Sequence, residues 1–485
     1  MTFAIDAKHP AYIAFAKSWR QMRDAVGGDD DVKAQGEAYL PMKSADAAVP
    51  DPAERARLYA SYVLRAEFPE IVAPTITGQL GLICSQAPTF KLPARMEGMV
   101  EEATLDGLTL EDLVARVVAE ILTVGRYGLQ PSFRGDGSPY LAGYCAESII
   151  NWDAGGGAVS FVVLDESGLV RNPATNVWEA KTRFRELRVV DGVFESVEWL
   201  DAGGGVTPQE AQRFSRSATI PRAVDFMPFV FMGTRALTAE PDDVPLYGLA
   251  RIALRMYRLD ADYQQALHMT SEPTPWVTGW DDPKAAMENG AVPSAIGAAN
   301  LWVLPNGGEA GFLEFSGPGL DAQRKAIDAE REAAATFGAR MFDEGGQAPE
   351  SGESRKVRYA HTTASLKTIA KVACAGVEKA LRNQARWMGL DPAEVSIVPN
   401  LDWVTDAMSP AEIGALVSAW QAGAISYPTL FDRLKAGKVI SAERDMDEET
   451  AGILDDPVRH QMPSRIDPMD PESGLLPPPQ QTAAP

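Results

Sequence analysis

The sequence predicts an α+β protein in which long helices bracket a small extended insert. Three observations lead to this fold class. Helical periodicity covers residues 247–270, 320–342 and 362–388. β-rich runs between turn signals fill residues 127–230, and the insert at 272–319 is rich in glycine and proline. Helices this long with little apolar surface are expected to pack against copies of themselves, so that function comes from assembly.

The composition is that of an acidic chain. Its 485 residues suggest two to four domains, and its hydrophobic content of 45% is ordinary for a globular protein. Its 45 lysines and arginines against 67 aspartates and glutamates give a formal net charge of −22. This charge repels phosphates and argues against a sequence-reading DNA binder, but it suits a surface past which DNA slides without sticking.

Cysteine usage and the terminus indicate a reducing compartment. Cys84, Cys145 and Cys374 are far apart, odd in number and form no CxxC, so a disulfide framework or zinc site is not expected. The N-terminus lacks the basic segment and apolar core of a signal peptide. No run of about 18 apolar residues occurs, so no transmembrane helix is expected.

The N-terminal region is predicted to be helical at 8–25 and 51–66. Asp51 supplies a capping carboxylate, Pro52 takes the first helical position and Glu54 lies in the first turn.

Two further helices are expected before the β region. Residues 68–86 form an apolar segment that glycine and proline break at its ends. Thr109 is predicted to cap the next helix and Gly125 to end it. Between them, apolar residues recur at helical spacing: Leu113, Val114, Val117, Val118, Ile121 and Leu122.

Residues 127–230 predict a mostly antiparallel β subdomain. Strands are expected at 161–164, 184–190 and 193–200. Asp191-Gly192 between the last two is a strong hairpin signal.

The first two long helices carry charged stripes. On the first, Arg251, Arg255 and Arg258 recur at i+3/i+4 spacing. We expect them to pair with carboxylates of the second helix, within a subunit or between neighbours, rather than to touch DNA. The second helix has an alanine stripe and a separate charged stripe formed by Asp321, Lys325, Asp328 and Glu332.

The insert and the loop after the second helix have different characters. Short strands are expected at 276–278, 301–304 and 311–315, in an insert that contains Trp276, Trp280 and Trp302. Residues 343–354 read DEGGQAPESGES, a polar loop without a lysine or arginine before Arg355.

The C-terminal region is predicted to be three helices and a tail. Ser409 and Glu412 form a capping box that opens a helix through Trp420. Further helices are expected at 426–436 and 441–454. Residues 456–485 are proline-rich and are expected to be disordered.

No catalytic, metal or cofactor site is predicted. His9, His268, His361 and His460 have no metal-ligand spacing, and the chain has neither a P-loop nor a GxSxG elbow. The acidic pairs Asp242-Asp243 and Asp281-Asp282 could hold a divalent ion. In a chain with 67 acidic residues, solvated pairs formed by chance are the better interpretation.

The order of these parts resembles that of bacteriophage portal proteins over about residues 8–455. Segments that carry the resemblance include YASYVLRAEF (59–68), YCAESIINW (144–152), MPFVF (227–231) and LDADY (259–263), followed by PTPWVTG (273–279). Each motif is weak alone, and their order and spacing are more specific. PLYGLA at 245–250 and GAIS at 423–426 belong to the same series.

The resemblance implies a ring, usually of twelve subunits, at one capsid vertex. It assigns the chain to seven successive parts and a tail. These are a wing (1–246), a stem helix (247–271), a clip (272–319), a second stem helix (320–342), a tunnel loop (343–354), a long wing helix with its return (355–405), a helical crown (406–455) and the tail (456–485).

The resemblance also implies roles for residues. Arg251, Arg255, Arg258, Asp328 and Glu332 would belong to the stem. Trp276, Trp280 and Trp302 would belong to a clip that binds partners. The tunnel loop facing DNA would present Glu344, Gly345, Gly346, Gln347, Glu350 and Ser351. Its acidity departs from a phosphate-binding loop and suits sliding.

The implied partners are those of virion assembly. They are other copies of the chain, the terminase large subunit, a head–tail adaptor, the major capsid and scaffolding proteins, and double-stranded DNA that passes without sequence specificity. The implied location is the capsid vertex, and the host cytoplasm during assembly, with no cofactor and no membrane contact.

Two alternatives remain at the level of sequence. One is a metal-dependent phage hydrolase or nuclease that uses Asp281 and Asp282. The other is a different virion structural protein, such as a scaffold or an adaptor, against which the β region at 127–230 argues.

Overall fold

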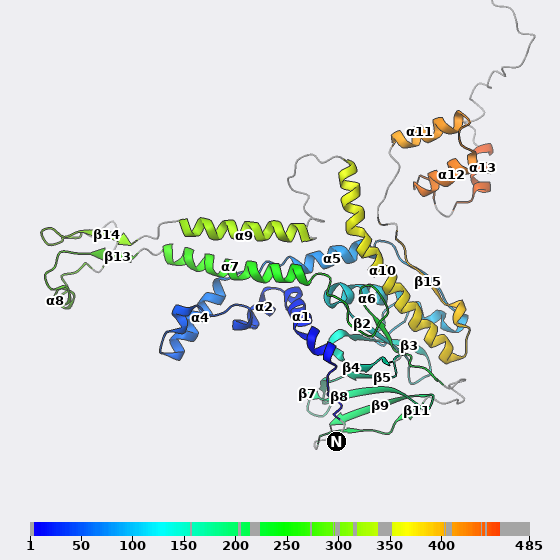
Figure 1. Ribbon diagram of the computed structural model, residues 1–485, viewed down its shortest axis with the longest axis horizontal. Helices are drawn as coiled ribbons and strands as arrows, with labels where there is room; N and C mark the ends of the chain where they lie inside the picture. Colours follow the sequence, from blue (N-terminus) through cyan, green and yellow to red (C-terminus); the bar gives the residue numbers. More distant parts are fainter. Residues whose placement is uncertain are drawn as a thin grey trace, which may run out of the picture. The chain divides into compact units, whose positions relative to one another are not determined.

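The computed structural model divides into two compact units, Met1–Trp403 and Val404–Pro485 (Figure 1). Helices and antiparallel strands both contribute, which agrees with a mixed α and β class. The structure describes residues 4–155, 158–201, 205–213, 224–271, 274–293, 295, 301–313, 318–337, 352–401, 403, 410–437, 439–441 and 444–455.

The N-terminal helices begin and end where local signals predict. Asp51 accepts a hydrogen bond from the Ala53 amide at the start of α4. Thr109 and Asp112 form a complete capping box on α6, and Gly125 ends it with φ 75°. The helices are α1 (Pro10–Gly27), α2 (Asp29–Ala34), α3 (Ser44–Ala47), α4 (Pro52–Arg65), α5 (Val72–Ile83) and α6 (Leu110–Val124).

The predicted β region forms two larger sheets and one separate hairpin, all antiparallel. One sheet has the order β10-β9-β8-β5-β4, with β11 also paired to β9, and the other has the order β12-β2-β3. The strands are β2 (Tyr127–Phe133), β3 (Pro139–Cys145), β4 (Ile149–Asp153), β5 (Phe161–Asp165), β6 (Gly168–Arg171), β7 (Trp178–Lys181), β8 (Arg183–Val190), β9 (Val193–Asp201), β10 (Val206–Pro208), β11 (Gln212–Arg213) and β12 (Val230–Met232).

The Asp191-Gly192 hairpin is confirmed. Asp191 has φ 51° and Gly192 has φ 73°, the left-handed pair that a type I′ turn requires. Val190 therefore pairs with Val193, and this register continues to Arg183 opposite Leu200.

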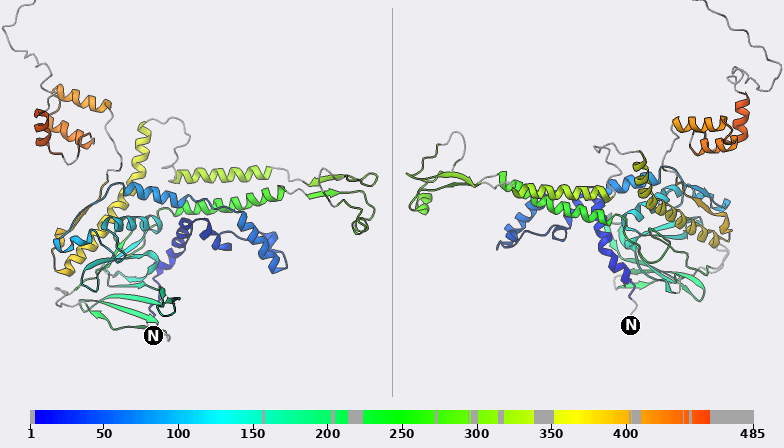
Figure 2. Two further views of the ribbon diagram at one scale, coloured as in Figure 1. Left: turned by 180° about the vertical axis from the view of Figure 1, so that it is seen from behind. Right: turned by 45° about the horizontal axis from the view of Figure 1, so that its top comes forward.

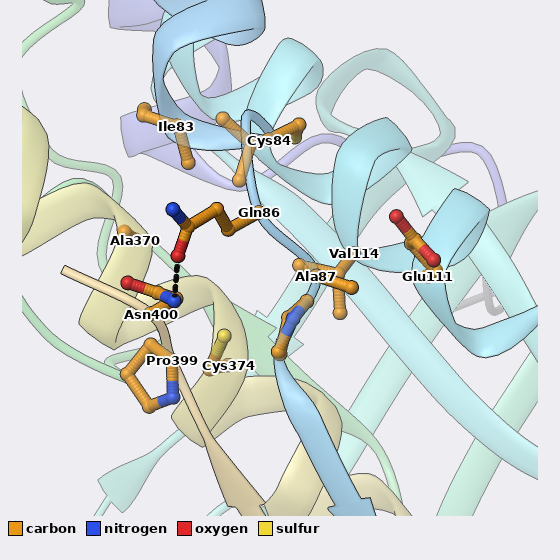
Figure 3. Close-up of a pocket in the computed structure, with 12 residues that line it drawn as sticks. Ile83, Cys84, Gln86, Ala87, Glu111, Val114, Ala370, Cys374, Pro399 and Asn400 are labelled. Atoms are coloured by element: carbon orange, nitrogen blue, oxygen red, sulfur yellow. Dashed lines mark hydrogen bonds between the residues drawn. The ribbon is translucent and has the colours of Figure 1, made fainter. Parts of the chain in front are cut away.

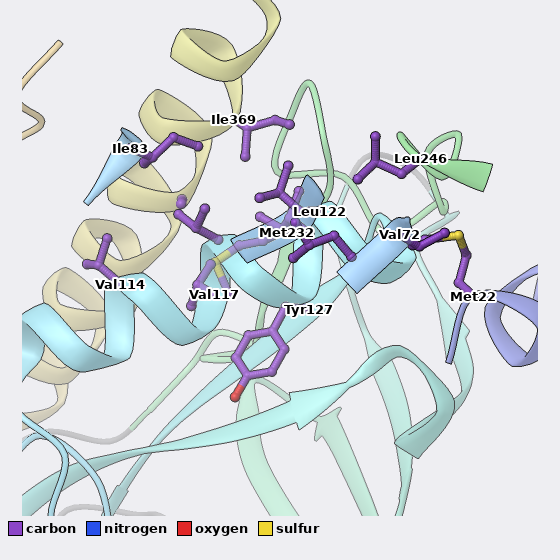
Figure 4. Close-up of a cluster of buried hydrophobic side chains, with 14 of the residues drawn as sticks. Met22, Val72, Ile83, Val114, Val117, Leu122, Tyr127, Met232, Leu246 and Ile369 are labelled. Carbon is purple, nitrogen blue, oxygen red and sulfur yellow. The ribbon is translucent and has the colours of Figure 1, made fainter. Parts of the chain in front are cut away.

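A helix and strands from the end of the first unit complete its core. Helix α10 (Gly352–Met388) contacts α6, β2 and β12, and β15 (Ser396–Val398) pairs with β1 (Thr89–Lys91). Buried side chains gather where α5, α6 and α10 meet, among them Val117, Leu122 and Ile369 (Figure 4). A second cluster packs Trp19 and Trp387 with the six-stranded sheet. Burial of each such side chain contributes roughly 1.5–3 kcal/mol.

A helical hairpin projects from this core. Helix α7 (Tyr247–Ser271) and helix α9 (Pro318–Phe337) lie side by side in all views (Figures 1 and 2). Between them in sequence come β13 (Thr274–Val277), α8 (Pro283–Glu288) and β14 (Ala310–Leu313).

The structure corrects three predicted elements here. Residues 301–304 are not a strand, and α8 was not predicted. Helix α10 begins at Gly352, ten residues before the predicted start, so residues 352–354 belong to a helix rather than to the polar loop. The residues after Gly352 include Glu353, Arg355 and Lys356, which have high helix propensity. This stretch has no apolar periodicity, so the sequence pattern does not indicate a helix there.

The second unit contains α11 (Pro410–Gln421), α12 (Tyr427–Ala436) and α13 (Met446–Asp455). Ser426 caps α12 by accepting from the Thr429 amide, and α13 begins five residues after the predicted start. Ser409 of the predicted capping box and the tail at 456–485 lie outside the described residues. None of the described helices is long and apolar enough to cross a membrane.

Candidate functional site

The candidate site is the hairpin of α7 and α9 together with the elements at its tip. The buried side chains of α7 lie toward its start. They begin at Leu249 and the last is Ala261, so the ten residues that follow have no buried side chain. Six of these ten residues are half-buried, so the end of α7 is covered less completely than its start.

One pair of charged residues joins the two helices of the hairpin. The Arg255 guanidinium donates from Nε and Nη2 to both carboxylate oxygens of Glu330, at 3.0 and 2.7 Å. This pairing within one subunit agrees with the expectation for the arginine stripe. The acceptor, however, is Glu330 rather than Asp328 or Glu332.

The helical period explains that difference. The least exposed side of α9 follows Leu320, Gln323, Ile327, Glu330 and Ala334, at spacings of three and four residues. Glu330 lies on this stripe. Asp328 lies off it and bonds instead to Arg331 of its own helix, at 3.4 Å.

The other two arginines of the predicted stripe have different surroundings. Arg258 Nε donates to the carbonyl oxygen of Tyr39 at 2.7 Å. Arg251 lies over the ring of Tyr247, at 6.0 Å from its centroid. The three arginines therefore do not form one surface that pairs with α9.

Polar residues of α7 that are not among the predicted stem residues attach the N-terminal helices. The Tyr62 hydroxyl donates to Asp262 at 2.6 Å, and the Glu67 amide donates to Asp260 at 2.9 Å. Arg65 also bonds to Gln265. Because these contacts join residues about 200 positions apart, no local pattern could have shown them.

The tip of the hairpin is a two-stranded sheet with a helix beside it in sequence. Trp276 of β13 pairs with Gly311 of β14, and the indole lies where a Cβ on Gly311 would be. The Trp302 indole donates to the carbonyl of Ala295 at 2.8 Å, and Trp280 is partly exposed. The structure thus places all three predicted tryptophans in the insert.

The tip also exposes apolar side chains. Met287, Leu301 and Val303 are largely exposed to solvent. Leu301 and Val303 are two residues apart in sequence, and Met287 lies in α8.

The residues predicted to face DNA lie outside the described part of the chain. They are Glu344, Gly345, Gly346, Gln347, Glu350 and Ser351.

The acidic pairs act in local structure. Asp282 Oδ1 accepts from the Ala285 amide and caps α8. Asp242 accepts from the Arg235 amide and the Thr234 hydroxyl. Within the described part of the chain, no cluster of three or more His, Cys, Asp or Glu could hold a metal ion.

A small pocket lies between α5, α6 and α10. Cys84, Cys374, Gln86 and Asn400 are among the residues that line it, and its volume is about 20 Å³, room for about one water (Figure 3). Gln86 and Asn400 bond to each other across its mouth. Burial raises the pKa of Cys374 to about 12 and also raises the pKa of Cys84, which disfavours the nucleophilic thiolate.

Comparison with known proteins gives one family match and distant structural matches. A family described as a domain of unknown function (DUF4055) matches residues 245–388. This span begins two residues before α7 and ends with the last residue of α10. No curated protein matches the chain.

The solved structures that match include two particle necks. One is the neck of an empty GTA particle with C6 symmetry, with 16% identity and a TM-score of 0.37, covering 76% of this chain and 90% of that chain. The other is the neck of a native GTA particle with C12 symmetry, with 14% identity and a TM-score of 0.37, covering 75% and 89%.

Proposed function

We propose that the chain is the portal subunit of a phage-like particle. Copies would form a ring at one capsid vertex, through which double-stranded DNA enters and leaves. The observation that carries the proposal is the pairing of α7 with α9 around a tip whose two described strands pair with each other, followed by the long helix α10. The match to residues 245–388 covers this same succession of elements.

The end of α7 supports assembly. The ten residues beyond Ala261 have no buried side chain, so packing within the chain stabilises this part of the helix less than its start. Neighbouring hairpins in a ring would supply that packing. Because Arg255 is already paired within the subunit, α7 has one fewer free cation to present to a DNA channel.

The charge of the chain supports a conduit rather than a DNA-binding protein. With a formal net charge of −22, the ring would repel phosphates, so DNA would slide without sticking. In this proposal the chain is not an enzyme, and a separate ATPase drives packaging. The major capsid and scaffolding proteins would contact the ring during assembly in the host cytoplasm.

The tip is proposed to dock the terminase large subunit and later the head–tail adaptor. Met287, Leu301 and Val303 would supply apolar contact area around Trp276, Trp280 and Trp302. A nuclease that uses Asp281 and Asp282 has less support, since Asp282 already caps α8.

Negative-stain electron microscopy of the purified full chain, with its mass measured in solution, tests the proposal. The expected result is rings with a central hole near the width of duplex DNA and no ATP hydrolysis above the buffer blank. Monodisperse monomers under assembly conditions, or metal-dependent cleavage of DNA, would contradict it.

The tip is tested separately with the double substitution Leu301→Ser and Val303→Ser. Both side chains are exposed, so the ring should still form. Binding to the terminase large subunit should weaken at least tenfold. A matched control is Leu64→Ser, which removes an exposed apolar side chain far along the sequence from the tip.

A further inference from the structure

A small β-hairpin, residues 168–181, stands apart from the sheets of the first unit. We call it the arm. Among the strands that the structure describes, β6 and β7 pair only with each other, and every residue in both is exposed. The arm continues the β5–β8 hairpin, whose strands are joined below it by a hydrogen bond from the Glu166 amide to the Arg183 carbonyl at 2.9 Å.

Polar contacts fix the end of the arm. The Asn172 amide donates to the Val177 carbonyl at 2.9 Å, and Asn176 takes a left-handed φ of 57°. The Arg171 guanidinium donates to Asn176 Oδ1 at 2.7 Å, and the Asn172 side chain donates to Glu179 at 2.8 Å. The turn is thus ordered before any partner binds, which lowers the entropic cost of binding.

Both faces of the arm carry exposed apolar side chains. Leu169, Val170, Val177 and Trp178 are between 49% and 66% exposed. The register places Leu169 and Trp178 on one face and Val170 on the other. A two-stranded sheet is marginally stable alone in water, and exposed tryptophan is enriched at the centres of protein interfaces. The arm therefore has the properties of an interface element that no described strand of its own chain covers.

We propose that the arm binds a second copy of this chain. The charge of the arm favours an acidic partner. The arm contains Arg171 and Lys181 against the single acid Glu179, in a chain whose formal net charge is −22. Another copy offers the acidic surface that a basic, apolar arm complements.

One described loop of the chain has the matching character. Leu105 is 65% exposed, and Glu101, Glu102 and Asp106 around it are exposed acids. Arg116 pairs with Asp106 at 2.6 Å and Arg134 with Glu102 at 3.0 Å, so these contacts fix the loop, and Glu101 is the acid of this loop for which the structure gives no ion pair among the described residues. We assign residues 101–106 as the surface that receives the arm.

An arm on one copy and a receiving loop on the next form a head-to-tail contact. Such heterologous contacts generate rings when the rotation closes. The inference rests on the proposed function and deepens it, because it names the surface through which the copies join.

Photocrosslinking in the full chain tests the inference. Trp178 is replaced by p-benzoylphenylalanine, and the purified protein is irradiated. The expected product is a covalent dimer whose crosslinked peptide contains residues 101–106. Absence of interchain products, or interchain products whose crosslinked peptides all lie outside residues 101–106, would overturn the inference. The same sample irradiated in denaturant is the control for random encounter.

Assembly of a double variant gives the second readout. Leu169→Ser with Trp178→Ser should raise the concentration needed for assembly at least tenfold, whereas Leu64→Ser, which removes a side chain that is 80% exposed, should not. Rings that form without arm crosslinks overturn this inference alone. Arm-dependent oligomers that are not rings overturn the proposed function alone, and monomers overturn both.

Discussion

The hydroxyl of Tyr62 donates a hydrogen bond of 2.6 Å to Asp262, across 200 positions of sequence. Burial, and then Asp262, raises the pKa of Tyr62, so the hydroxyl stays a donor at physiological pH. The Lys43 ammonium lies over the Tyr62 ring, at 4.1 Å from its centroid. The bond joins α4 to α7 just beyond the last buried residue of α7, Ala261.

Replacing Tyr62 by phenylalanine removes this bond and keeps the ring. We expect a loss of about 1–2 kcal/mol in the free energy of unfolding, because the acceptor is a carboxylate. Tyr59→Phe is the matched control, since the Tyr59 hydroxyl donates to the neutral carbonyl of Leu40 at 2.8 Å. Urea denaturation of both variants measures the difference. A loss for Tyr62→Phe no larger than that for Tyr59→Phe would contradict this account.

The bidentate pair of Arg255 and Glu330 should couple the two helices weakly. Both side chains are partly exposed, so solvent screens the pair and the coupling free energy should be about 0.3–1 kcal/mol. A double-mutant cycle with alanine at both positions measures it. The control cycle on Arg331 and Asp328, a more exposed pair at 3.4 Å, should give no measurable coupling. Equal coupling in the two cycles would argue against a specific link.

Local signals allowed several element boundaries to be predicted. Asp51 and Thr109 cap helices where their side chains can reach the second or third amide, and Gly125 ends α6 in a conformation that other residues resist. The Asp191-Gly192 turn fixes its own hairpin in the same way. In each case the atoms that set the end of the helix or the turn lie within a few residues of one another.

The contacts of the candidate site are not local, and the sequence could not supply them. The charged stripe predicted for α9 contained Asp328, yet Glu330 faces α7, because a shift of two residues turns a helix by more than half a turn. The bond between Tyr62 and Asp262 depends on how two distant helices pack. The arm was not predicted because its strands are short and exposed on both faces, which leaves no alternating pattern.

Arg23 should link stability to acid pH. Its guanidinium donates to Glu120 at 2.6 and 2.9 Å and to Glu147 at 2.9 and 3.1 Å. Burial alone would raise the pKa of Glu147, but Arg23 outweighs it and lowers that pKa below its ordinary value of 4.5. The stabilisation by this carboxylate is therefore complete above pH 4.5 and is lost as the pH falls through the lowered pKa.

The variant Arg23→Met reverses this dependence. Without the cation, burial raises the pKa of Glu147, so the cost should be about 1–2 kcal/mol at pH 7 after solvent screening and should shrink at pH 4. Urea midpoints at the two pH values measure the change. Arg57→Met, which breaks an exposed pair with Glu54, should leave both midpoints unchanged. A cost for Arg23→Met that does not depend on pH would count against the assigned role.

Gly376 lets α10 pass close to β12. A Cβ at this position would overlap the thioether of Met232, a side chain with no exposed surface. Gly376→Ala should therefore lower the free energy of unfolding by about 1–3 kcal/mol, because overpacking outweighs the gain in helix propensity of about 1 kcal/mol. Gly81→Ala in α5 is the control: nothing lies within 4 Å of its Cβ position, so only the propensity gain should remain. Urea denaturation should move the two midpoints in opposite directions. A Gly376→Ala protein as stable as the parent would mean that α10 shifts on the sheet at little cost, and the close approach of α10 to β12 would then not depend on this glycine.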